Sequence, residues 1–185
     1  MKKALLSILC FFSIMIQAQT EHLKFMGIPL DGSITAFHTK LQGKGLKYDA
    51  ETTRQLDLCC RCYRGSFSGE KASFFVYYNE KTKIVYRAKA VITYQNKELG
   101  EEKFKSYKSL LKTKYSEGNV HDDEQNGHPA LTIVVPDSKM ERKLGYVSMY
   151  INNAVYSFID EVYLNIDYED RANSEGNESS NMDDL

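Results

Sequence analysis

Apolar and polar side chains alternate with a period of two along much of this chain, and this pattern limits its possible folds more than any other feature. The clearest runs are 74–78, 84–94, 131–135, 147–151 and 162–168. In a further run, Leu56, Leu58, Cys60 and Cys62 alternate with Asp57, Cys59, Arg61 and Tyr63. Residues that alternate in this way line the two faces of a strand. We therefore expect an antiparallel sheet of about six strands with one face covered.

Two segments have helical spacing instead. Ile34, Phe37 and Leu41 follow the N-cap candidate Ser33, and Gly43 and Gly45 end that run. A second helix is expected to open at Gly100, with its apolar face at Phe104, Tyr107, Leu111 and Tyr115. The sequence thus predicts an α+β protein whose sheet packs against two helices. The helix starts lie about 68 residues apart, which suggests half-repeats over 31–95 and 99–168.

The first eighteen residues are typical of a secretory signal peptide. Lys2 and Lys3 precede an apolar stretch over 4–16, and the small residue Ala18 follows. The stretch is shorter than the ~20 apolar residues that a membrane-spanning helix needs. We expect cleavage near Ala18 and export to the periplasm or beyond, with an uncleaved membrane anchor as the alternative.

Charge and composition narrow the remaining classes. The formal net charge is −1 and no basic block is present, so a nucleic-acid partner is not expected. No segment after 1–18 reaches a membrane-spanning length. The apolar pattern ends at Tyr168, so we expect one α+β domain over 19–168 and a disordered acidic tail over 169–185.

Four segments carry a resemblance to a group of small exported proteins of Bacteroidetes-type bacteria. They are His22–Gly32, Arg64–Gly69, Leu111–Tyr115 and Val162–Tyr168. The layout of helices and strands is also similar to the tandem helix-plus-sheet units of beta-lactamase-inhibitor-like proteins. The second likeness is one of topology, and it implies a binding surface on an open sheet instead of an active-site cleft.

The cysteines are the most unusual local feature. Cys59, Cys60 and Cys62 would enter an oxidising compartment, where cysteines often pair. Cys60 and Cys62 share a strand face, and Cys59 points the other way. We interpret them as small core residues. A disulfide remains an alternative, as does a soft-metal site made by Cys60, Cys62 and a donor such as His38.

The face of the sheet away from the core is predicted to carry the binding residues. The chain has 13 tyrosines and 9 phenylalanines, and tyrosine is enriched at interfaces. A partly covered face is the alternative interpretation. The candidate residues by alternation are Tyr63, Phe75, Tyr77, Arg61, Arg87 and Lys89.

Known catalytic motifs are not matched. The segment His121–His128 partly resembles a calcium loop, but Ile133 stands where the bidentate glutamate belongs, so a solvated loop is expected. Gly27–Ser33 lacks the P-loop lysine, and Phe67 replaces the serine of a nucleophile elbow. We expect a non-enzymatic exported binding module without a cofactor, whose partner is an envelope or extracellular protein or ligand. A thiol-based metal or redox protein and a hydrolase with an unrecognised site are the alternatives.

Overall fold

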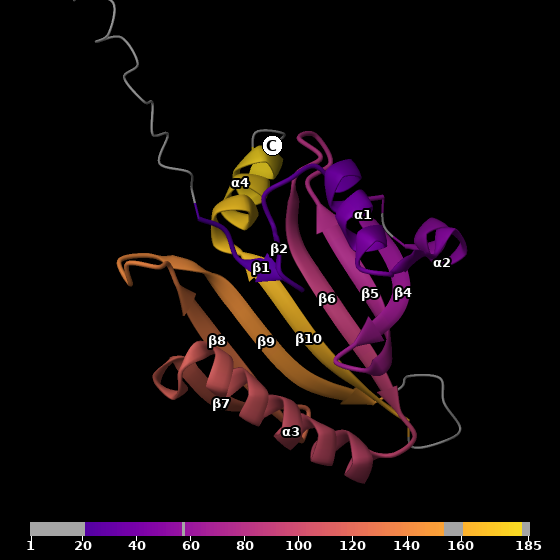
Figure 1. Ribbon diagram of the computed structural model, residues 1–185, viewed down its shortest axis with the longest axis vertical. Helices are drawn as coiled ribbons and strands as arrows, with labels where there is room; N and C mark the ends of the chain where they lie inside the picture. The colour runs from indigo at the N-terminus through magenta and orange to yellow at the C-terminus, as the bar shows by residue number, and fades with distance from the viewer. Residues whose placement is uncertain (1–20, 57, 154–160, 183–185) are drawn as a thin grey trace, which may run out of the picture.

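The computed structural model describes residues 21–56, 58–153 and 161–182 (Figure 1). The predicted signal peptide, 1–18, lies outside the described residues. Four α-helices are present: α1 (Ile34–Gly43), α2 (Ala50–Gln55), α3 (Lys97–Tyr115) and α4 (Arg171–Met182). A short 3-10 helix, η1 (Glu117–Asn119), follows α3. The strands are β1 (Lys24–Phe25), β2 (Ile28–Pro29), β3 (Lys47–Tyr48), β4 (Cys60–Phe67), β5 (Glu70–Tyr78), β6 (Val85–Tyr94), β7 (Val120–Gln125), β8 (His128–Pro136), β9 (Lys143–Asn153) and β10 (Val162–Asp170).

One antiparallel sheet contains eight of these strands in the order β3-β4-β5-β6-β10-β9-β8-β7. The α+β class and the antiparallel pairing are confirmed. The expected number of about six strands is wrong, because the two edge strands β3 and β7 lack an apolar alternation. A separate two-stranded sheet is made by β1 and β2.

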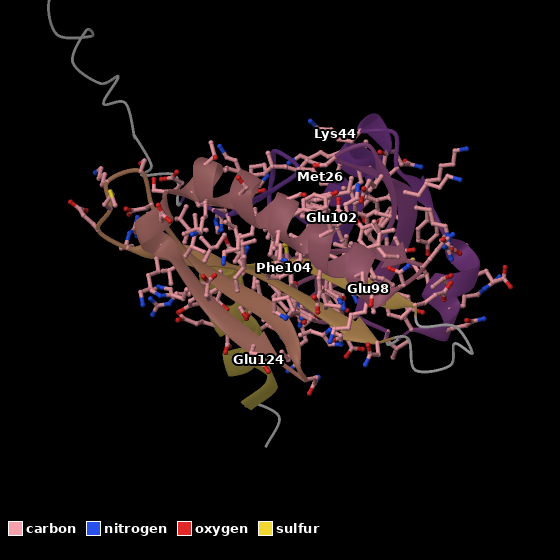
Figure 2. All side chains as sticks on the ribbon, turned by 90° about the horizontal axis from the view of Figure 1, so that it is seen from below. Met26, Lys44, Glu98, Glu102, Phe104 and Glu124 are labelled. Carbon is pink, nitrogen blue, oxygen red and sulfur yellow. The ribbon has the colours of Figure 1, made fainter. Side chains whose placement is uncertain are left out.

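The helices α1 and α3 cover one face of the sheet. In α1, Ile34, Phe37 and Leu41 are buried, and the Ser33 hydroxyl accepts a hydrogen bond from the backbone N–H of Ala36. The sequence therefore predicted α1 and its cap correctly. In Figure 2, α3 lies along one side of the sheet, with Phe104 in the packed layer between them.

The start of α3 lies earlier than the sequence suggested. Asn96 caps the helix by accepting from the backbone N–H of Leu99, so Gly100 lies within the first turns. A Cβ atom added at Gly100 would lie 2.4 Å from Cγ2 of Val162 on β10. Glycine is therefore required here for close packing of α3 on the sheet, and its presence does not mark the helix start.

The segment after Tyr168, for which the sequence suggested a disordered tail, contains the end of β10 and the helix α4. β10 continues to Asp170, whose buried carboxylate accepts from the backbone N–H groups of Leu23 and Asn173. Asn173 also donates to the carbonyl oxygens of Leu30 and Val85. These contacts join α4 to the sheet and to the first strands of the chain, which polar composition alone does not reveal.

The sheet order divides the chain into two halves. The strands β3–β6 form one side of the sheet and β7–β10 the other, and the last strand of each half, β6 and β10, pair at the centre. Each half also begins with a helix, α1 or α3. This arrangement is compatible with the predicted half-repeats, which stay a prediction.

Candidate functional site: an open face of the sheet

The face of the sheet opposite α1 and α3 is called the open face here. α4 packs against the ends of β6, β9 and β10, and Ser174 of α4 donates to Glu169 at the border of this face. α2 lies beside β4 at the edge of this face, where its Thr52 hydroxyl accepts from Arg64. Its central strands place the following side chains there by register: Cys60, Cys62, Arg64, Lys71, Ser73, Phe75, Tyr77, Arg87, Lys89, Val91, Thr93, Tyr146, Ser148, Tyr150, Tyr163, Asn165, Asp167 and Glu169.

Four of the six predicted binding residues lie together on the open face. Phe75 and Tyr77 of β5 pair with Lys89 and Arg87 of β6, respectively. The Nζ atom of Lys89 lies 5.5 Å from the Phe75 ring centroid, and Cζ of Arg87 lies 5.1 Å from that of Tyr77. Both distances are within the range of cation–π interactions. The four side chains therefore form one continuous, partly buried patch.

Tyr63 and Arg61 belong to the opposite face, which corrects their predicted position. Tyr63 is fully buried, and its hydroxyl is hydrogen-bonded to Nδ1 of His38 at 3.1 Å. Burial raises the pKa of Tyr63 to about 12. β4 pairs with β5 so that Tyr63 is opposite Phe74 and Cys62 is opposite Phe75. A strand has a period of two, so this register reverses the predicted assignment of every β4 side chain.

The cysteines consequently lie on the open-face side of β4. Cys60 and Cys62 are buried beside Tyr77 and Phe75. Burial raises the pKa of Cys62, whose thiol donates to the carbonyl oxygen of Tyr63. His38 lies on the other side of the sheet, with Tyr63. The described residues contain no group of three or more His, Cys, Asp or Glu side chains that could hold a metal ion.

An ion pair fixes the centre of the open face. The Nε atom of Arg87 donates to both carboxylate oxygens of Asp167, at 2.9 and 3.0 Å, and Nη2 donates to Oδ2. The Arg87 side chain is 35% exposed and that of Asp167 7%. The hydrogen bonds that Arg87 donates to Asp167 raise the pKa of Arg87. The pair connects β6 with β10 at the centre of the sheet.

Lys89 is a partly buried cation beside this pair. Its burial lowers the pKa of the ammonium group. Asp167 is its direct cross-strand neighbour, but that carboxylate binds Arg87. Within the described part of the chain, no carboxylate lies within ion-pair distance of Lys89 Nζ. Burial removes water from the ammonium group, and the attraction of the nearby Asp167 offsets only part of this cost, because the pKa of Lys89 is lowered overall.

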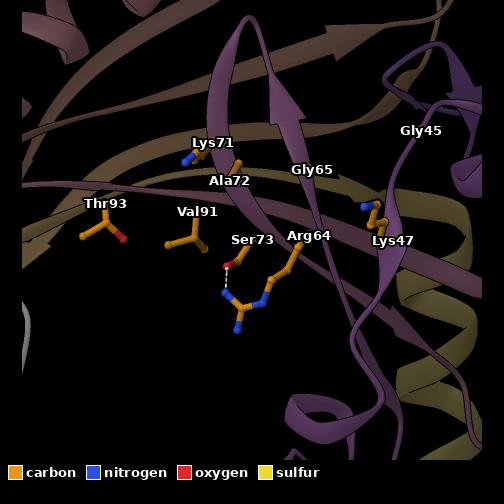
Figure 3. A pocket seen from close by; sticks show the side chains of 9 residues that line it. All are labelled: Gly45, Lys47, Arg64, Gly65, Lys71, Ala72, Ser73, Val91 and Thr93. Atoms are coloured by element: carbon orange, nitrogen blue, oxygen red, sulfur yellow. Dashed lines mark hydrogen bonds between the residues drawn. The ribbon is translucent and has the colours of Figure 1, made fainter.

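A pocket of about 490 Å³ opens on the same face beside β3, β4, β5 and β6 (Figure 3). The side chains that line it are mainly cations, hydroxyls and small apolar groups: Gly45, Lys47, Arg64, Gly65, Lys71, Ala72, Ser73, Val91 and Thr93. Sequence reasoning missed this pocket, because its lining residues come from four strands whose pairing the sequence does not specify.

Arg64 is held in place at the pocket by three polar contacts. Its Nε donates to Oδ2 of Asp49 at 2.6 Å, Nη2 donates to the Thr52 hydroxyl, and Nη1 donates to the Ser73 hydroxyl at 3.4 Å. The backbone N–H of Thr52 also donates to Asp49, and these hydrogen bonds lower the pKa of Asp49 to about 2. Asp49 is therefore ionised at physiological pH and orients the guanidinium.

The open face shows no arrangement for nucleophilic catalysis. Among the described strand residues of this face, the hydroxyls of Ser73, Thr93 and Ser148 are not hydrogen-bonded to a histidine or a carboxylate, and the Ser174 hydroxyl that donates to Glu169 belongs to α4 at its border. The segment His121–Gln125, expected as a loop, is part of the edge strand β7 and leads through a tight turn into β8. Nε2 of His128 is hydrogen-bonded to Oδ1 of Asn153, so this buried histidine connects β8 to the end of β9.

No helix of the described residues combines the length and the apolar character that a bilayer crossing requires.

The chain was compared with models of protein families, with curated protein sequences and with solved structures. No match was found in any of the three comparisons.

Proposed function

We propose that this chain is an exported, non-enzymatic binding module that docks a protein with an acidic surface on the open face. One observation carries the proposal: Lys89 is a partly buried cation beside the ring of Phe75, without an ion-pair partner among the described residues. An acidic group of a docked protein would supply the missing anion. Charge complementarity of this kind speeds association and selects the partner.

The neighbouring side chains suit such an interface. Four partly exposed aromatic side chains lie on this face: Phe75 and Tyr77 on β5, and Tyr146 and Tyr150 on β9. Aromatic side chains provide large contact areas at a low entropic cost and dominate binding hot spots. Arg87 and Asp167 are already paired, so the surface is ordered before a partner arrives, which lowers the cost of binding.

The alternatives have less support. The three-ligand thiol site of Cys60, Cys62 and His38 is not assembled, because the histidine lies across the sheet. A hydrolase would need a nucleophile with an adjacent base, and the open face places none beside its serines and threonines within the described residues. We therefore put forward no second function.

The first experiment identifies the partner by cross-linking from defined positions of the chain. A photoreactive phenylalanine analogue is placed at Phe75 or Tyr150, and at Lys105 on the outer side of α3 as a control. The full chain is then cross-linked in extracts of the cell envelope. We expect one acidic protein to be linked from the open face and not from position 105. The absence of any such link contradicts the proposal.

The captured protein is then purified and its affinity measured. Tyr77→Ala and Lys89→Gln are each expected to weaken binding by about tenfold, the effect of losing a hot-spot side chain. Lys105→Gln should leave the affinity unchanged. Equal affinities for the wild type and both open-face variants would refute the docking surface. N-terminal sequencing of the protein from the periplasm or medium tests export, with a start near Gln19 expected.

A further inference from the structure

We propose that the pocket at β3–β6 is a carboxylate-binding site that receives acidic side chains of the docked protein, with Lys47, Arg64 and Lys71 as its recognition cations. This inference rests on the proposed function and specifies which part of the open face selects the partner. Its first support is the concentration of positive charge. Three cationic side chains line a single pocket of about 490 Å³, and no acidic side chain is among its lining residues.

Two of these cations have no internal counter-charge. In the part of the chain that the structure describes, Lys47 and Lys71 form no ion pair, whereas most lysines of α3 do, for example Lys103 with Glu70 and Lys108 with Asp122. Lys47 and Lys71 lie on different strands, β3 and β5, and reach the pocket from two sides. An anion between them would be attracted by both ammonium groups.

Arg64 provides the fixed element of the site. Asp49 holds its Nε, so the position of the guanidinium is set before a ligand binds. The Ser73 hydroxyl accepts from Nη1 of Arg64 in the pocket (Figure 3), which leaves its own hydrogen free to donate to a ligand oxygen. A carboxylate can thus receive charge from the guanidinium and a hydrogen bond from Ser73. Charge-assisted hydrogen bonds of this type are about twice as strong as neutral ones.

The apolar part of the lining favours an acidic side chain over a small inorganic anion. Val91 and Ala72 contribute apolar surface to the pocket. Phe75 follows Ser73 by two residues on β5 and therefore lies on the same face. The methylene groups of a glutamate or aspartate can pack there, whereas phosphate or sulfate would lose hydration without such contact.

Lys89 extends the site towards the centre of the face. It lies two residues before Val91 on β6, so the two side chains are on the same face, about 7 Å apart along the strand. An extended partner segment has its alternate side chains at the same spacing. Two acidic residues separated by one position can therefore reach the pocket and Lys89 together, and this spacing is the recognition feature that we infer.

Fluorescence anisotropy of the full chain with a labelled peptide tests the site. The probe is a peptide of three Glu-Gly repeats, and its control is the same peptide with Gln in place of Glu. We expect the acidic peptide alone to bind, and the affinity to fall as salt is raised from about 0.05 to 0.3 M because exposed charges are screened. Failure of the acidic peptide to bind at millimolar concentration overturns the proposal.

Variants locate the binding within the molecule. Lys47→Gln and Lys71→Gln are each expected to weaken peptide binding by about threefold and the double variant by about tenfold, as for rim charges that act independently. Lys105→Gln is the control and should bind like the wild type. All three are exposed lysines, so folding is not at risk, and equal affinities for the double variant and the wild type contradict the site.

Competition arms separate the sources of the anion. Inorganic phosphate at 10-fold excess over the peptide and vesicles containing phosphatidylserine are added in turn. Displacement by phosphate would show a general anion site, and displacement by vesicles a membrane-binding site, and either result overturns the proposal of a carboxylate site for a protein. Persistence of the peptide complex in both arms supports it.

Failure of this inference is distinguishable from failure of the proposed function. If Tyr77→Ala lowers the affinity for the captured protein and the Lys47/Lys71 double variant does not, the open face docks the protein without the pocket. In that case the inference is wrong. If the double variant loses the acidic peptide while Tyr77→Ala and Lys89→Gln leave the captured protein unaffected, the pocket binds carboxylates and the proposed function is wrong.

Discussion

Arg87 on β6 and Asp167 on β10 are joined across the central strand pair of the sheet, with the guanidinium Nε 2.9 Å from Oδ1 of the carboxylate. The two residues are diagonal neighbours, because Arg87 is directly opposite Glu169 and Lys89 directly opposite Asp167. One carboxylate therefore lies near two cations and binds one of them. The hydrogen bonds from Arg87 stabilise the junction of the two halves, and Lys89 forms no ion pair with a described residue.

Asp167→Asn is expected to lower the free energy of unfolding by about 2 kcal/mol. The substitution leaves Arg87 partly buried without its counter-charge, and the cost is below that of a fully buried pair because the guanidinium retains some exposure. Urea denaturation measures the change. The double variant Arg87→Gln/Asp167→Asn should recover part of the loss. A single variant that unfolds at the wild-type urea concentration would show that the pair adds no stability.

Lys89→Met should make the protein more stable while it weakens binding of the acidic peptide. Burial lowers the pKa of Lys89, so the folded state holds its proton less tightly than the unfolded state. Below the folded-state pKa both states are protonated and the folded state bears the full cost of the buried charge. Methionine removes this cost, and a gain of about 1 kcal/mol would raise the Tm by about 2–4 °C. A lower Tm would contradict the conclusion that the buried charge of Lys89 destabilises the folded protein.

The pH dependence of stability should include a contribution from Asp49. Its pKa is lowered from 3.8 to about 2 in the folded protein, so the unfolded state binds the proton more readily. The stabilisation is complete above about pH 4 and is lost as the pH falls through about 2. Asp49→Asn retains a capping side chain for α2 but cannot ionise. The variant should show a shallower loss of stability between pH 4 and 2 in circular dichroism titrations, and identical acid titrations would refute this assignment.

Gly100→Ala is expected to destabilise the protein by about 1–3 kcal/mol, although alanine favours helices. The added Cβ would lie 2.4 Å from Cγ2 of Val162, so α3 or β10 must shift. Val162→Ala removes the Cγ2 atom that causes the clash. In a protein that already carries Val162→Ala, the further substitution Gly100→Ala should therefore cost much less than it does in the wild type. Thermal unfolding of the four proteins measures the coupling, and additive effects would contradict direct contact.

The sequence predicted the helix-covered side of the sheet better than its open side. Periodicity placed Phe37 and Leu41 of α1 and Ala88, Ala90 and Ile92 of β6 correctly, because one face of each element is strongly apolar. The face assignment predicted for β4 was wrong because both faces of this strand carry side chains that can be buried, Cys62 on one face and Tyr63 on the other. Pairing with β5 decides between them, and a single strand contains no information on that pairing.

The candidate site was predictable only where it lies on consecutive strands. Phe75, Tyr77, Arg87 and Lys89 follow from the alternation of β5 and β6, which a short turn connects. Asp167 and the pocket were missed. Asp167 reaches Arg87 through the long-range pairing of β6 with β10, and Lys47 reaches the pocket through β3, whose two residues have no recognisable pattern. The helix α4 likewise depends on contacts that are distant in sequence, since its Asn173 donates to the carbonyl oxygens of Leu30 and Val85.

The pairing of β6 with β10 also determines when this molecule can finish folding. β6 pairs with β5 on one side, but its partner on the other side, β10, is the last strand in sequence order among the described residues. Until β10 arrives, β6 presents an unpaired edge with the apolar residues of the core exposed beside it, a state prone to aggregation. Closure of so distant a contact is slow compared with formation of local structure. The native sheet can therefore form only once β10 has been synthesised, so the two halves of the sheet are joined late in folding.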